Sequence, residues 1–340
     1  MKSFVIQNGF GLEHVSLAER PVPVPGPGEA LIKLRAASLN SRDLGVVGGF
    51  YFPKDKLPLI PVSDGVGEVV ALGEQTARLA RLRIGDRVNG TFSQRWISGD
   101  PTEEWLSGTL GGPLDGMLTE YAVLHEDGLV RVPEHLTDEE AATLPCAGVT
   151  AWQALVAAGH IKAGDTVLVQ GTGGVSLFAI QFAKMQGAKV IVTSSSDDKL
   201  ERAKQLGADF GINYRTTPEW DKAALEWTNG RGADHVVDLG GAATLNRSVG
   251  AVRFGGRISL IGILSGAAVE DFQLIPVFQK RVRLQGINVG NRDMFEAMNR
   301  AIEHIKLRPV IDRVFPFEQS IEALRYLDKG TYFGKICIKF

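Results

Sequence analysis

The sequence predicts an α/β protein that combines a β-rich domain with a doubly wound parallel sheet. In the first third of the chain, short segments with β-branched residues alternate with turns rich in proline and glycine. From residue 165 onward, strand-like and helix-like segments alternate instead, as they do where right-handed crossovers join parallel strands. The length of 340 residues is enough for about two domains.

The β-rich region contains several segments that read as strands. Each combines β-branched residues with partial alternation and is bounded by turn residues. They are residues 2–7, 29–40, 65–73, 83–90 and 119–124. Residues 91–116 show no such pattern, and a loop of this length usually has a function or covers another part of the protein.

The second region begins with a nearly continuous apolar run at 165–170, which is typical of a strand buried on both faces. Further strands are expected at 188–194, 209–214, 234–241 and 255–264, with helices at 175–187, 197–208 and 217–230. After these we expect an edge strand at 277–289, one helix at 292–305, and a strand at 334–340 that could return to the first domain.

Composition and charge exclude several classes of function. The net charge of −2 gives no basic surface for nucleic acid. No apolar run approaches the roughly 20 residues that span a bilayer, and the N-terminus does not read as a signal peptide. Cys146 and Cys337 are too few for a disulfide framework and suit a reducing compartment. We therefore expect a cytoplasmic protein that binds neither nucleic acid nor membrane.

A glycine-rich turn joins the strand at 165–170 to the following helix, which is the context in which such a turn binds a dinucleotide. One glycine makes the tight turn, the next lets the backbone approach the pyrophosphate, and the helix N-terminus faces the phosphates. The expected contacts are Gly171, Gly173, Gly174 and Val175. Ser176 stands at the third fingerprint glycine, where a small residue still permits close packing. The alternative is a plain strand-to-helix turn.

The end of the second strand of the parallel sheet indicates which cofactor binds. An NAD enzyme has a carboxylate there, whereas this chain has Ser194, which does not repel a 2′-phosphate. Lys199 and Arg202 add positive charge nearby. Asp197 and Asp198 argue the other way, but we interpret them as the acidic first turn of a helix. We predict NADP(H).

Ligands of an open α/β sheet bind at the carboxyl ends of its strands. Gly240, Gly262 and Ile263 lie at such ends in the fourth and fifth predicted strands, so we expect them to contact the cofactor.

Six motifs occur in an order that resembles one family. They are "PGPGEALIKLRAASLN", "SDGVGEVVALG", "GDRV", "LPCAGVTAW", "GTGGVS" and "GKICI". The chain resembles the medium-chain dehydrogenase/reductase superfamily, in its zinc-free quinone oxidoreductase-like branch, beside the zinc-type alcohol dehydrogenases. The resemblance implies a GroES-like catalytic domain built from residues 1–148 and 289–340. It also implies a Rossmann domain for NADP(H) at 149–288.

Zinc enzymes of this superfamily hold their catalytic metal with a Cys, a His-Glu pair and a second Cys. The matching positions here are Asn40, Ser63, Asp64 and Cys146. One thiolate cannot hold a catalytic zinc, and residues 80–115 lack the four cysteines of the structural zinc lobe. We therefore expect no zinc. Cys146 reads as a small packing residue, with a partial metal ligand or a reactive thiol as alternatives.

Hydride transfer without zinc favours acceptors that delocalise the incoming charge, such as quinones and α,β-unsaturated carbonyls, because hydrogen-bond donors can stabilise the resulting oxyanion. We expect Asn40 to be such a donor, with Ser41 and Asp64 as further catalytic candidates. Asn40 could instead end a strand in an Asx turn. Asp64 could be structural, paired with Arg42 or Lys335.

The resemblance also implies roles for residues outside the glycine turn. Thr150 matches a threonine at the nicotinamide end, Tyr214 an aromatic residue that covers the adenosine phosphate, and Lys335 a basic residue at the pyrophosphate. Tyr214 could simply end the third strand, and Lys335 could be a solvated surface lysine. Residues 50–52, all aromatic, could line a pocket for a planar acceptor or belong to the core.

These observations lead to an NADPH-dependent, zinc-independent oxidoreductase acting on a small planar substrate with an activated carbonyl. Two alternatives remain open: an alcohol or aldehyde dehydrogenase of the same superfamily, and an NADPH-binding sensor or structural protein with little turnover. A homodimer is expected, because pairing of the edge strand at 277–289 across a two-fold axis would remove an exposed edge.

Overall fold

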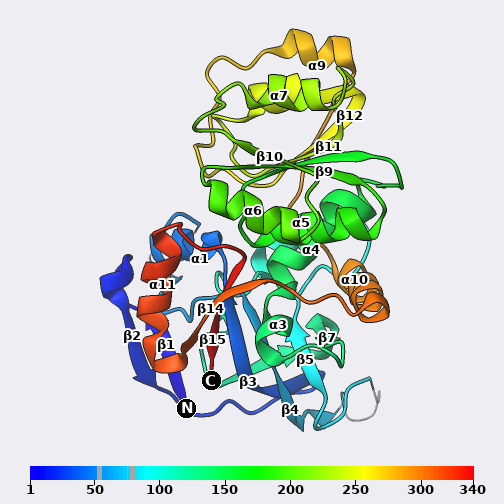
Figure 1. Ribbon diagram of the computed structural model, residues 1–340. Coiled ribbons are helices and arrows are strands. Elements are labelled where there is room, and N and C mark those ends of the chain that lie inside the picture. Colours follow the sequence, from blue (N-terminus) through cyan, green and yellow to red (C-terminus); the bar gives the residue numbers. More distant parts are fainter. Residues whose placement is uncertain (52–55, 75, 77–80) are drawn as a thin grey trace. The chain divides into compact units, whose positions relative to one another are not determined.

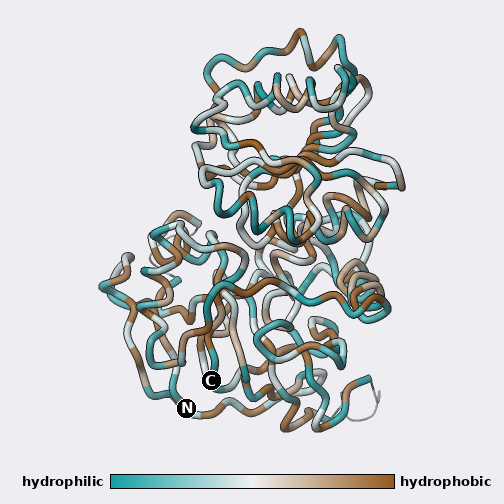
Figure 2. The backbone as a smooth tube through the Cα atoms, viewed as in Figure 1, coloured by the Kyte–Doolittle hydropathy of each residue, from teal (hydrophilic) through white to brown (hydrophobic). Residues whose placement is uncertain are grey.

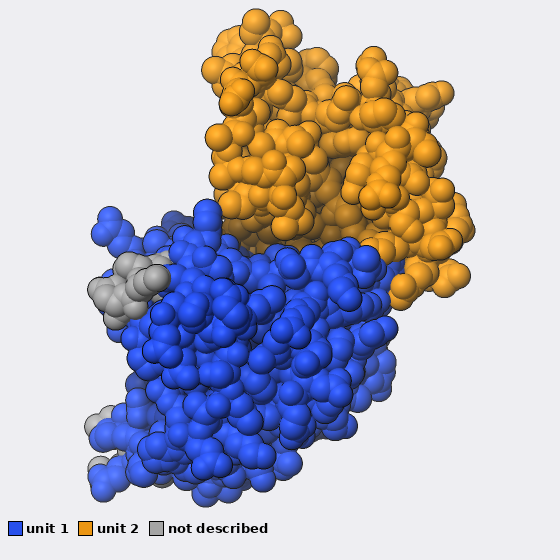
Figure 3. Space-filling model, turned by 90° about the vertical axis from the view of Figure 1, so that its left-hand side faces the viewer, with its two compact units in different colours: residues 1–149, 289–340 blue, residues 150–288 orange. Residues whose placement is uncertain are grey.

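The computed structural model describes residues 1–51, 56–74, 76 and 81–340. Its chain divides into two compact units, shown in separate colours in Figure 3. The first unit consists of residues 1–149 and 289–340, and the second of residues 150–288. The expected domain boundaries differ from these only at Val149, which lies in the first unit.

A seven-stranded sheet forms the centre of the first unit, beside a two-stranded ribbon of β1 and β2. The sheet has the order β14-β15-β3-β4-β5-β7, and β6 also pairs with β3. The strands are β1 Lys2–Ile6, β2 Val15–Glu19, β3 Glu29–Leu39, β4 Asp64–Leu72, β5 Arg87–Gly90, β6 Tyr121–His125, β7 Leu129–Arg131, β14 Ile311–Pro316 and β15 Lys335–Lys339. All five strands expected in the first region are present.

The strand β15 lies inside the sheet, parallel to β14 and antiparallel to β3. Ile336 is opposite Leu39 in this register. The expectation that residues 334–340 return to the first domain is confirmed. The first residues of β15 therefore pair with the carboxyl end of β3, and Asn40 follows directly after that end.

Among the described residues of this unit, four α-helices accompany the sheet: α1 Ser41–Val47, α3 Asp138–Ala142, α10 Arg292–Ile305 and α11 Ser320–Asp328. The helix α10 spans the residues predicted for it. The helix α11 was not predicted, although it buries Leu324 and Leu327 on one face. The short helix α4, Val149–Trp152, begins at the boundary between the units.

The long insertion at 91–116 contains a 3₁₀ segment, Glu103–Gly108, and packs on α10. The carbonyl oxygens of Trp96 and Ile97 accept the first helical N–H groups, those of Arg292 and Asp293, each at 3.1 Å. Helix N-termini have such donors unsatisfied unless another group accepts from them. The insertion therefore caps α10 with backbone carbonyls.

A six-stranded, all-parallel sheet forms the second unit, with the order β10-β9-β8-β11-β12-β13. Its strands are β8 Thr166–Gln170, β9 Lys189–Ser194, β10 Phe210–Asn213, β11 Ala233–Asp238, β12 Val252–Leu260 and β13 Arg283–Gly286. Its helices are α5 Gly174–Met185, α6 Asp197–Gln205, α7 Trp220–Trp227, α8 Leu245–Ala251 and α9 Leu274–Lys280. The helices α5 and α6 cover one face, and α7 and α9 lie on the other (Figure 1).

Apolar residues of the central strands make the core of this sheet, and Figure 2 shows the hydrophobic colour gathered there. Leu168, Ile191, Val236 and Ile258 are fully buried in one cluster on neighbouring strands. Burial on both faces explains why these strands read as apolar runs.

The edge strand expected at 277–289 is only partly correct. Residues 283–286 form the edge strand β13, but residues 277–280 are the last turn of α9. Arg281 ends this helix in a left-handed conformation, with φ 52°. Lys280 anchors the turn, because its ammonium donates to the carbonyl oxygens of Val249, Gly250 and Val252.

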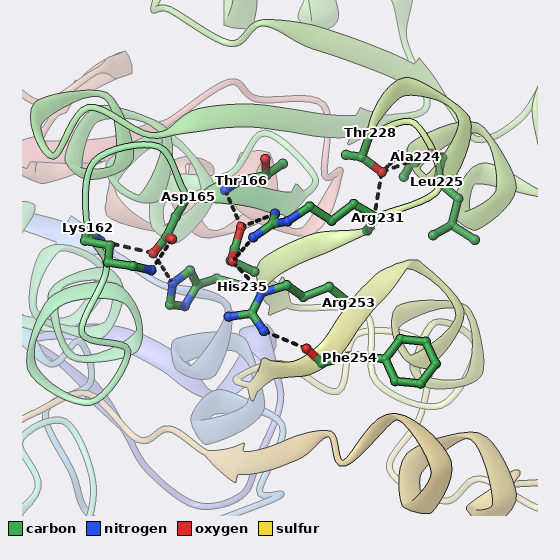
Figure 4. A network of polar contacts seen from close by, with 12 residues as sticks. Lys162, Asp165, Thr166, Ala224, Leu225, Thr228, Arg231, His235, Arg253 and Phe254 are labelled. Atoms are coloured by element: carbon green, nitrogen blue, oxygen red, sulfur yellow. Dashed lines mark hydrogen bonds and ion pairs between the residues drawn. The ribbon is translucent and has the colours of Figure 1, made fainter.

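A polar network holds together the amino ends of β8, β11 and β12 (Figure 4). The carboxylate of Asp234 accepts hydrogen bonds from Arg231, Arg253 and the Thr166 N–H. Burial acts to raise the pKa of Asp234, but these donors hold it well below the usual range. Nearby, His235 Nε2 lies 3.1 Å from Asp165 Oδ2.

Among the described residues, no helix is long and apolar enough to cross a membrane.

Candidate active site

Four separate elements of the first unit bring polar side chains to one place. Asn40 follows β3 and precedes α1, Asp64 begins β4, and Lys335 begins β15. Cys146 lies in a π-helical segment, Leu144–Gly148. Asn40, Asp64 and Cys146 stand at three of the four positions at which zinc enzymes of the resembled superfamily carry ligands. Ser63, directly before β4, stands at the fourth.

A chain of hydrogen bonds connects these groups. The Lys335 ammonium donates to Asn40 Oδ1 at 2.6 Å, and Asn40 Nδ2 lies 3.5 Å from Ser63 Oγ. Ser63 Oγ donates to Asp64 Oδ1 at 2.8 Å, and the Cys146 N–H donates to Asp64 Oδ2 at 3.0 Å. Asp64 and Ser63 are buried, whereas Asn40 is half-buried. The chain thus runs from a cation to a carboxylate through one partly accessible amide.

Two buried carboxyl groups set the electrostatics of this cluster. Burial raises the pKa of Asp64, while the Lys335 ammonium and hydrogen bonds from Asn40 and Ser63 act to lower it. Burial likewise raises the pKa of Asp43 to about 6, against the opposing effect of Arg42. Asp43 accepts from the backbone N–H of Asn40 at 2.7 Å, so it fixes the residue that carries the accessible amide.

Arg42 was one expected partner of Asp64, but its ion pair is with Asp43, at 3.9 Å. Its guanidinium donates to the carbonyl oxygens of Leu110 and Gly112 and lies 4.7 Å from the ring centroid of Phe92. The alternative in which Asp64 pairs with Arg42 is therefore wrong.

The sequence-predicted residue Ser41 is not part of the hydrogen-bonded chain. It is the first residue of α1 and exposed, and its hydroxyl interacts with Tyr332. Of the aromatic segment at 50–52, Phe50 and Tyr51 are exposed, with their rings in an edge contact at 5.2 Å. Phe52 lies outside the described residues. Their roles stay predictions.

The donor set at the zinc-ligand positions does not fit a catalytic zinc. An amide, a hydroxyl, a carboxylate and a thiol occupy them, whereas zinc takes thiolate, imidazole and carboxylate. Both oxygens of Asp64 already accept hydrogen bonds. Burial and the neighbouring Asp64 raise the pKa of the Cys146 thiol, which disfavours the thiolate. Within residues 1–51, 56–74, 76 and 81–340, no three His, Cys, Asp or Glu side chains form a group that could hold a metal.

The second unit carries the predicted glycine turn between β8 and α5. Gly171 has φ 74°, a left-handed conformation that favours glycine, and Gly173 is the N-cap of α5. Gly174 and Val175 are the first helical residues. Ser176, at the third fingerprint position, donates from its hydroxyl to the Gln170 carbonyl at 2.8 Å and so ties the helix to the strand. This turn fits a dinucleotide pyrophosphate at a helix N-terminus.

A network that the sequence analysis missed supports the next loop of this site. Gln170 Oε1 accepts from the N–H groups of Leu239 and Gly240, and Gln170 Nε2 donates to Asp238 Oδ2 and Ser248 Oγ. The signal was present, because Gln170 and Asp238 are polar residues that end otherwise apolar strands at the carboxyl edge.

Two of the expected strand-end glycines stand where no larger residue fits. A Cβ on Gly262 would lie 2.2 Å from the Leu239 carbonyl oxygen, and one on Gly240 would lie 2.4 Å from the Thr244 side chain. Ile263 beside them is 49% exposed, so its side chain is available to a ligand.

Ser194 ends β9 and is buried, with its Oγ accepting from the Ser196 N–H at 3.3 Å. Its carbonyl accepts from the N–H of Tyr214, whose side chain is exposed. The structure therefore brings Ser194 and Tyr214 together. The interpretation of the two aspartates is confirmed: Asp197 and Asp198 form the first turn of α6.

The remaining predicted residues lie elsewhere. Lys199 is in the first turn of α6, where its N–H donates to the Ser196 hydroxyl. Thr150 is buried in α4. Lys335 is only 3% exposed, so the alternative of a solvated surface lysine is wrong. Its predicted contact with a pyrophosphate stays a prediction.

Comparison with known proteins places this arrangement among related chains. Residues 26–134 match the family model described as alcohol dehydrogenase GroES-like domain, and residues 174–304 match the one described as zinc-binding dehydrogenase. A zinc-type alcohol dehydrogenase-like protein of Schizosaccharomyces pombe is 43% identical over 97% of this chain and 96% of its own.

Solved structures show the same similarity. A Sinorhizobium meliloti protein described as an alcohol dehydrogenase superposes with a TM-score of 0.92 at 43% identity, covering 100% of this chain and 98% of its own. A quinone oxidoreductase of Coxiella burnetii has a TM-score of 0.79 at 29% identity, with 100% and 99% covered. A mycobacterial protein in complex with NADPH has a TM-score of 0.84 at 25% identity, with both chains fully covered.

Proposed function

Because the chain belongs to the medium-chain dehydrogenase/reductase superfamily, in its zinc-type alcohol dehydrogenase-like branch, we propose that it reduces an activated carbonyl with NADPH and without zinc. Membership of this superfamily makes the chain an oxidoreductase with a GroES-like domain and a Rossmann-like sheet. The substrate class is a quinone or an α,β-unsaturated carbonyl.

One observation carries this proposal: an amide and a hydroxyl stand where zinc enzymes of the family have metal ligands. A quinone or enone that accepts a hydride develops negative charge on its oxygen, and a hydrogen-bond donor at that oxygen stabilises the charge. Asn40 Nδ2 has a long contact of 3.5 Å to Ser63 Oγ, which is weak, and it also interacts with the neighbouring Asp64 carboxylate. The substrate oxygen would replace the long contact to Ser63.

The cofactor supplies the hydride, and the protein positions and polarises the acceptor. Asn40 donates to the acceptor oxygen. The Ser63 hydroxyl donates its proton to Asp64, so toward Asn40 it can act only as an acceptor. Water supplies the proton that completes the reduction.

Three observations support NADPH rather than NADH. Ser194 ends β9 without a carboxylate, Lys199 lies in the first turn of the next helix, and Asp197 accepts a hydrogen bond from Asn213 at 2.8 Å. A ribose 2′-phosphate would meet hydroxyls and a cation at this edge. The NADPH complex of the mycobacterial relative is consistent with this assignment.

Alcohol or aldehyde dehydrogenase activity is the second candidate, since the Schizosaccharomyces pombe and Sinorhizobium meliloti relatives carry that description. It predicts oxidation of an alcohol with NADP⁺, dependent on a metal, whereas the first candidate predicts neither.

The deciding experiment measures NADPH consumption with a small 1,4-quinone after exhaustive chelation, with the bound metal quantified by mass spectrometry. Undiminished turnover supports the proposal, and NADH in place of NADPH should give a much higher KM. Turnover that vanishes with the metal and returns with zinc would establish the dehydrogenase instead. NADPH binding without turnover across a panel of acceptors would support a sensor or structural protein.

We further propose a cytoplasmic homodimer formed through the second unit. The strand β13 is an edge of its sheet, and α9 exposes three large apolar side chains: Leu274, Ile275 and Phe278. Phe278 is 84% exposed, so a charge there should disrupt an interface without harming the core. Sedimentation should show F278E to be monomeric and the control V24E, on the equally exposed Val24, to be dimeric. A dimeric F278E would refute this interface.

A further inference from the structure

We propose that Lys335 is a positioning residue that locks the Asn40 amide in the orientation that donates to the acceptor oxygen. This inference rests on the proposed function. It assigns Lys335 to the carbonyl end of the reaction rather than to the pyrophosphate.

The fold places Lys335 at Asn40 through backbone pairing. In the sheet of the first unit, β15 lies between β14 and β3, with Ile336 opposite Leu39. Lys335, one residue earlier, therefore meets the residue that follows Leu39. Its ammonium donates to the Leu39 carbonyl at 2.5 Å and to Asn40 Oδ1 at 2.6 Å.

A buried ammonium is costly unless it is hydrogen-bonded and electrically compensated. Here the compensation comes from the buried carboxyl groups of Asp64 and Asp43, whose pKa values the Lys335 charge acts to lower. Neither carboxylate lies within ion-pair distance of Lys335 among the described residues, and Asn40 supplies its side-chain acceptor. The cation is therefore directed at one amide.

Both ends of that amide are determined by their neighbours. An ammonium has donors only, so Oδ1 must face Lys335. Ser63 Oγ gives its proton to Asp64 Oδ1, so it can only accept on the side of Asn40, and Nδ2 must face it. A flipped amide would set NH₂ against the ammonium and would turn its oxygen toward the acceptor oxygen. Lys335 excludes that orientation and polarises the amide, which strengthens its N–H as a donor.

Loss of Lys335 should therefore act like loss of an oxyanion donor. We expect K335M to lower kcat with a quinone on the order of 10²-fold, the range for removal of one such donor. Its KM for NADPH, and the Kd for NADPH from quenching of tryptophan fluorescence, should stay within about twofold. A lysine on the pyrophosphate would give the opposite pattern, with Kd raised and kcat little changed.

The experiment is a double-mutant cycle of K335M, N40A and the double variant. If Lys335 acts through Asn40, the double variant should be no slower than N40A, because the amide that Lys335 positions is already absent. K335R keeps the charge and should recover part of kcat. K339M is the matched control, since Lys339 is on the same strand, largely exposed and paired with Glu139.

Three results overturn the inference: K335M with wild-type kcat, K335M and N40A effects that multiply, or a raised Kd for NADPH as the main defect of K335M. Thermal unfolding of each variant identifies misfolding, and if K335M fails to fold, the same cycle is run with K335R. Wild-type protein without any quinone turnover would instead overturn the proposed function, because the cycle compares the kcat of each variant with the kcat of the wild type.

Discussion

Replacing Gln170 by leucine should loosen the carboxyl edge of the second unit and weaken the binding of NADPH. Gln170 is 5% exposed and uses both ends of its amide. It accepts from Leu239 N–H at 3.1 Å and Gly240 N–H at 3.0 Å, and it donates to Asp238 at 3.1 Å and Ser248 at 2.8 Å. Leucine has similar bulk and makes none of these bonds.

The magnitude follows from the four bonds. A buried hydrogen bond contributes about 1 kcal/mol net, and one to a carboxylate about 2 kcal/mol, so the four together contribute about 5 kcal/mol. The leucine recovers about 1 kcal/mol through its apolar surface. We expect the free energy of unfolding to fall by about 4 kcal/mol, because the Leu239 and Gly240 N–H groups lose their acceptor.

Urea unfolding followed by tryptophan fluorescence measures this loss, because Trp152, Trp220 and Trp227 all lie in the second unit. Q205L is the control, since Gln205 is exposed on α6. A loss below about 1 kcal/mol, or an unchanged Kd for NADPH, would refute the view that this amide holds the cofactor loop.

Two other changes test the second unit. G262A should raise the Kd for NADPH at least tenfold, because its Cβ would lie 2.2 Å from the Leu239 carbonyl oxygen. The control G286A, with no atom within 4 Å of the added Cβ, should bind NADPH normally. Equal affinities of the two variants would contradict the view that Gly262 is needed for the close approach of its backbone to Leu239. Burial lowers the pKa of His235 from 6.5, so the unfolded chain binds a proton that the folded chain does not, and stability should fall as pH drops below about 6.5. H235Q should flatten this dependence in urea midpoints measured between pH 5 and 7, and an unchanged slope would show that another group titrates.

The parallel sheet could be predicted because local pattern and burial agree in it. The runs at β8, β9 and β11 are apolar since both faces are covered, and α5 begins at its glycine turn. The helix α9 was missed because its apolar residues, Leu274, Ile275, Val277 and Phe278, form one short run, and such a run does not distinguish a helix from a strand.

The candidate site was predictable only in part. Asn40 and Asp64 follow from motif positions, and the structure brings them together. The burial of Lys335 could not be predicted, because lysine is usually exposed and its partner comes from a strand 295 residues away. Asp43 was missed for a related reason, since its role depends on backbone N–H groups at Asn40 and Ser63.

The interior position of β15 has a consequence for synthesis of the protein. Ser38 on β3 and Ile336 on β15 are 298 residues apart, so a ribosome adding about 5–20 residues per second needs about 15–60 s between them. During that time residues 36–39 of β3 lack their partner strand β15, and an unpaired strand edge is a recognised route to aggregation. Residues 150–288 are contiguous and have emerged earlier. A nascent chain should therefore carry a finished second unit while the sheet of its first unit is unfinished, and chaperones should engage it at β3.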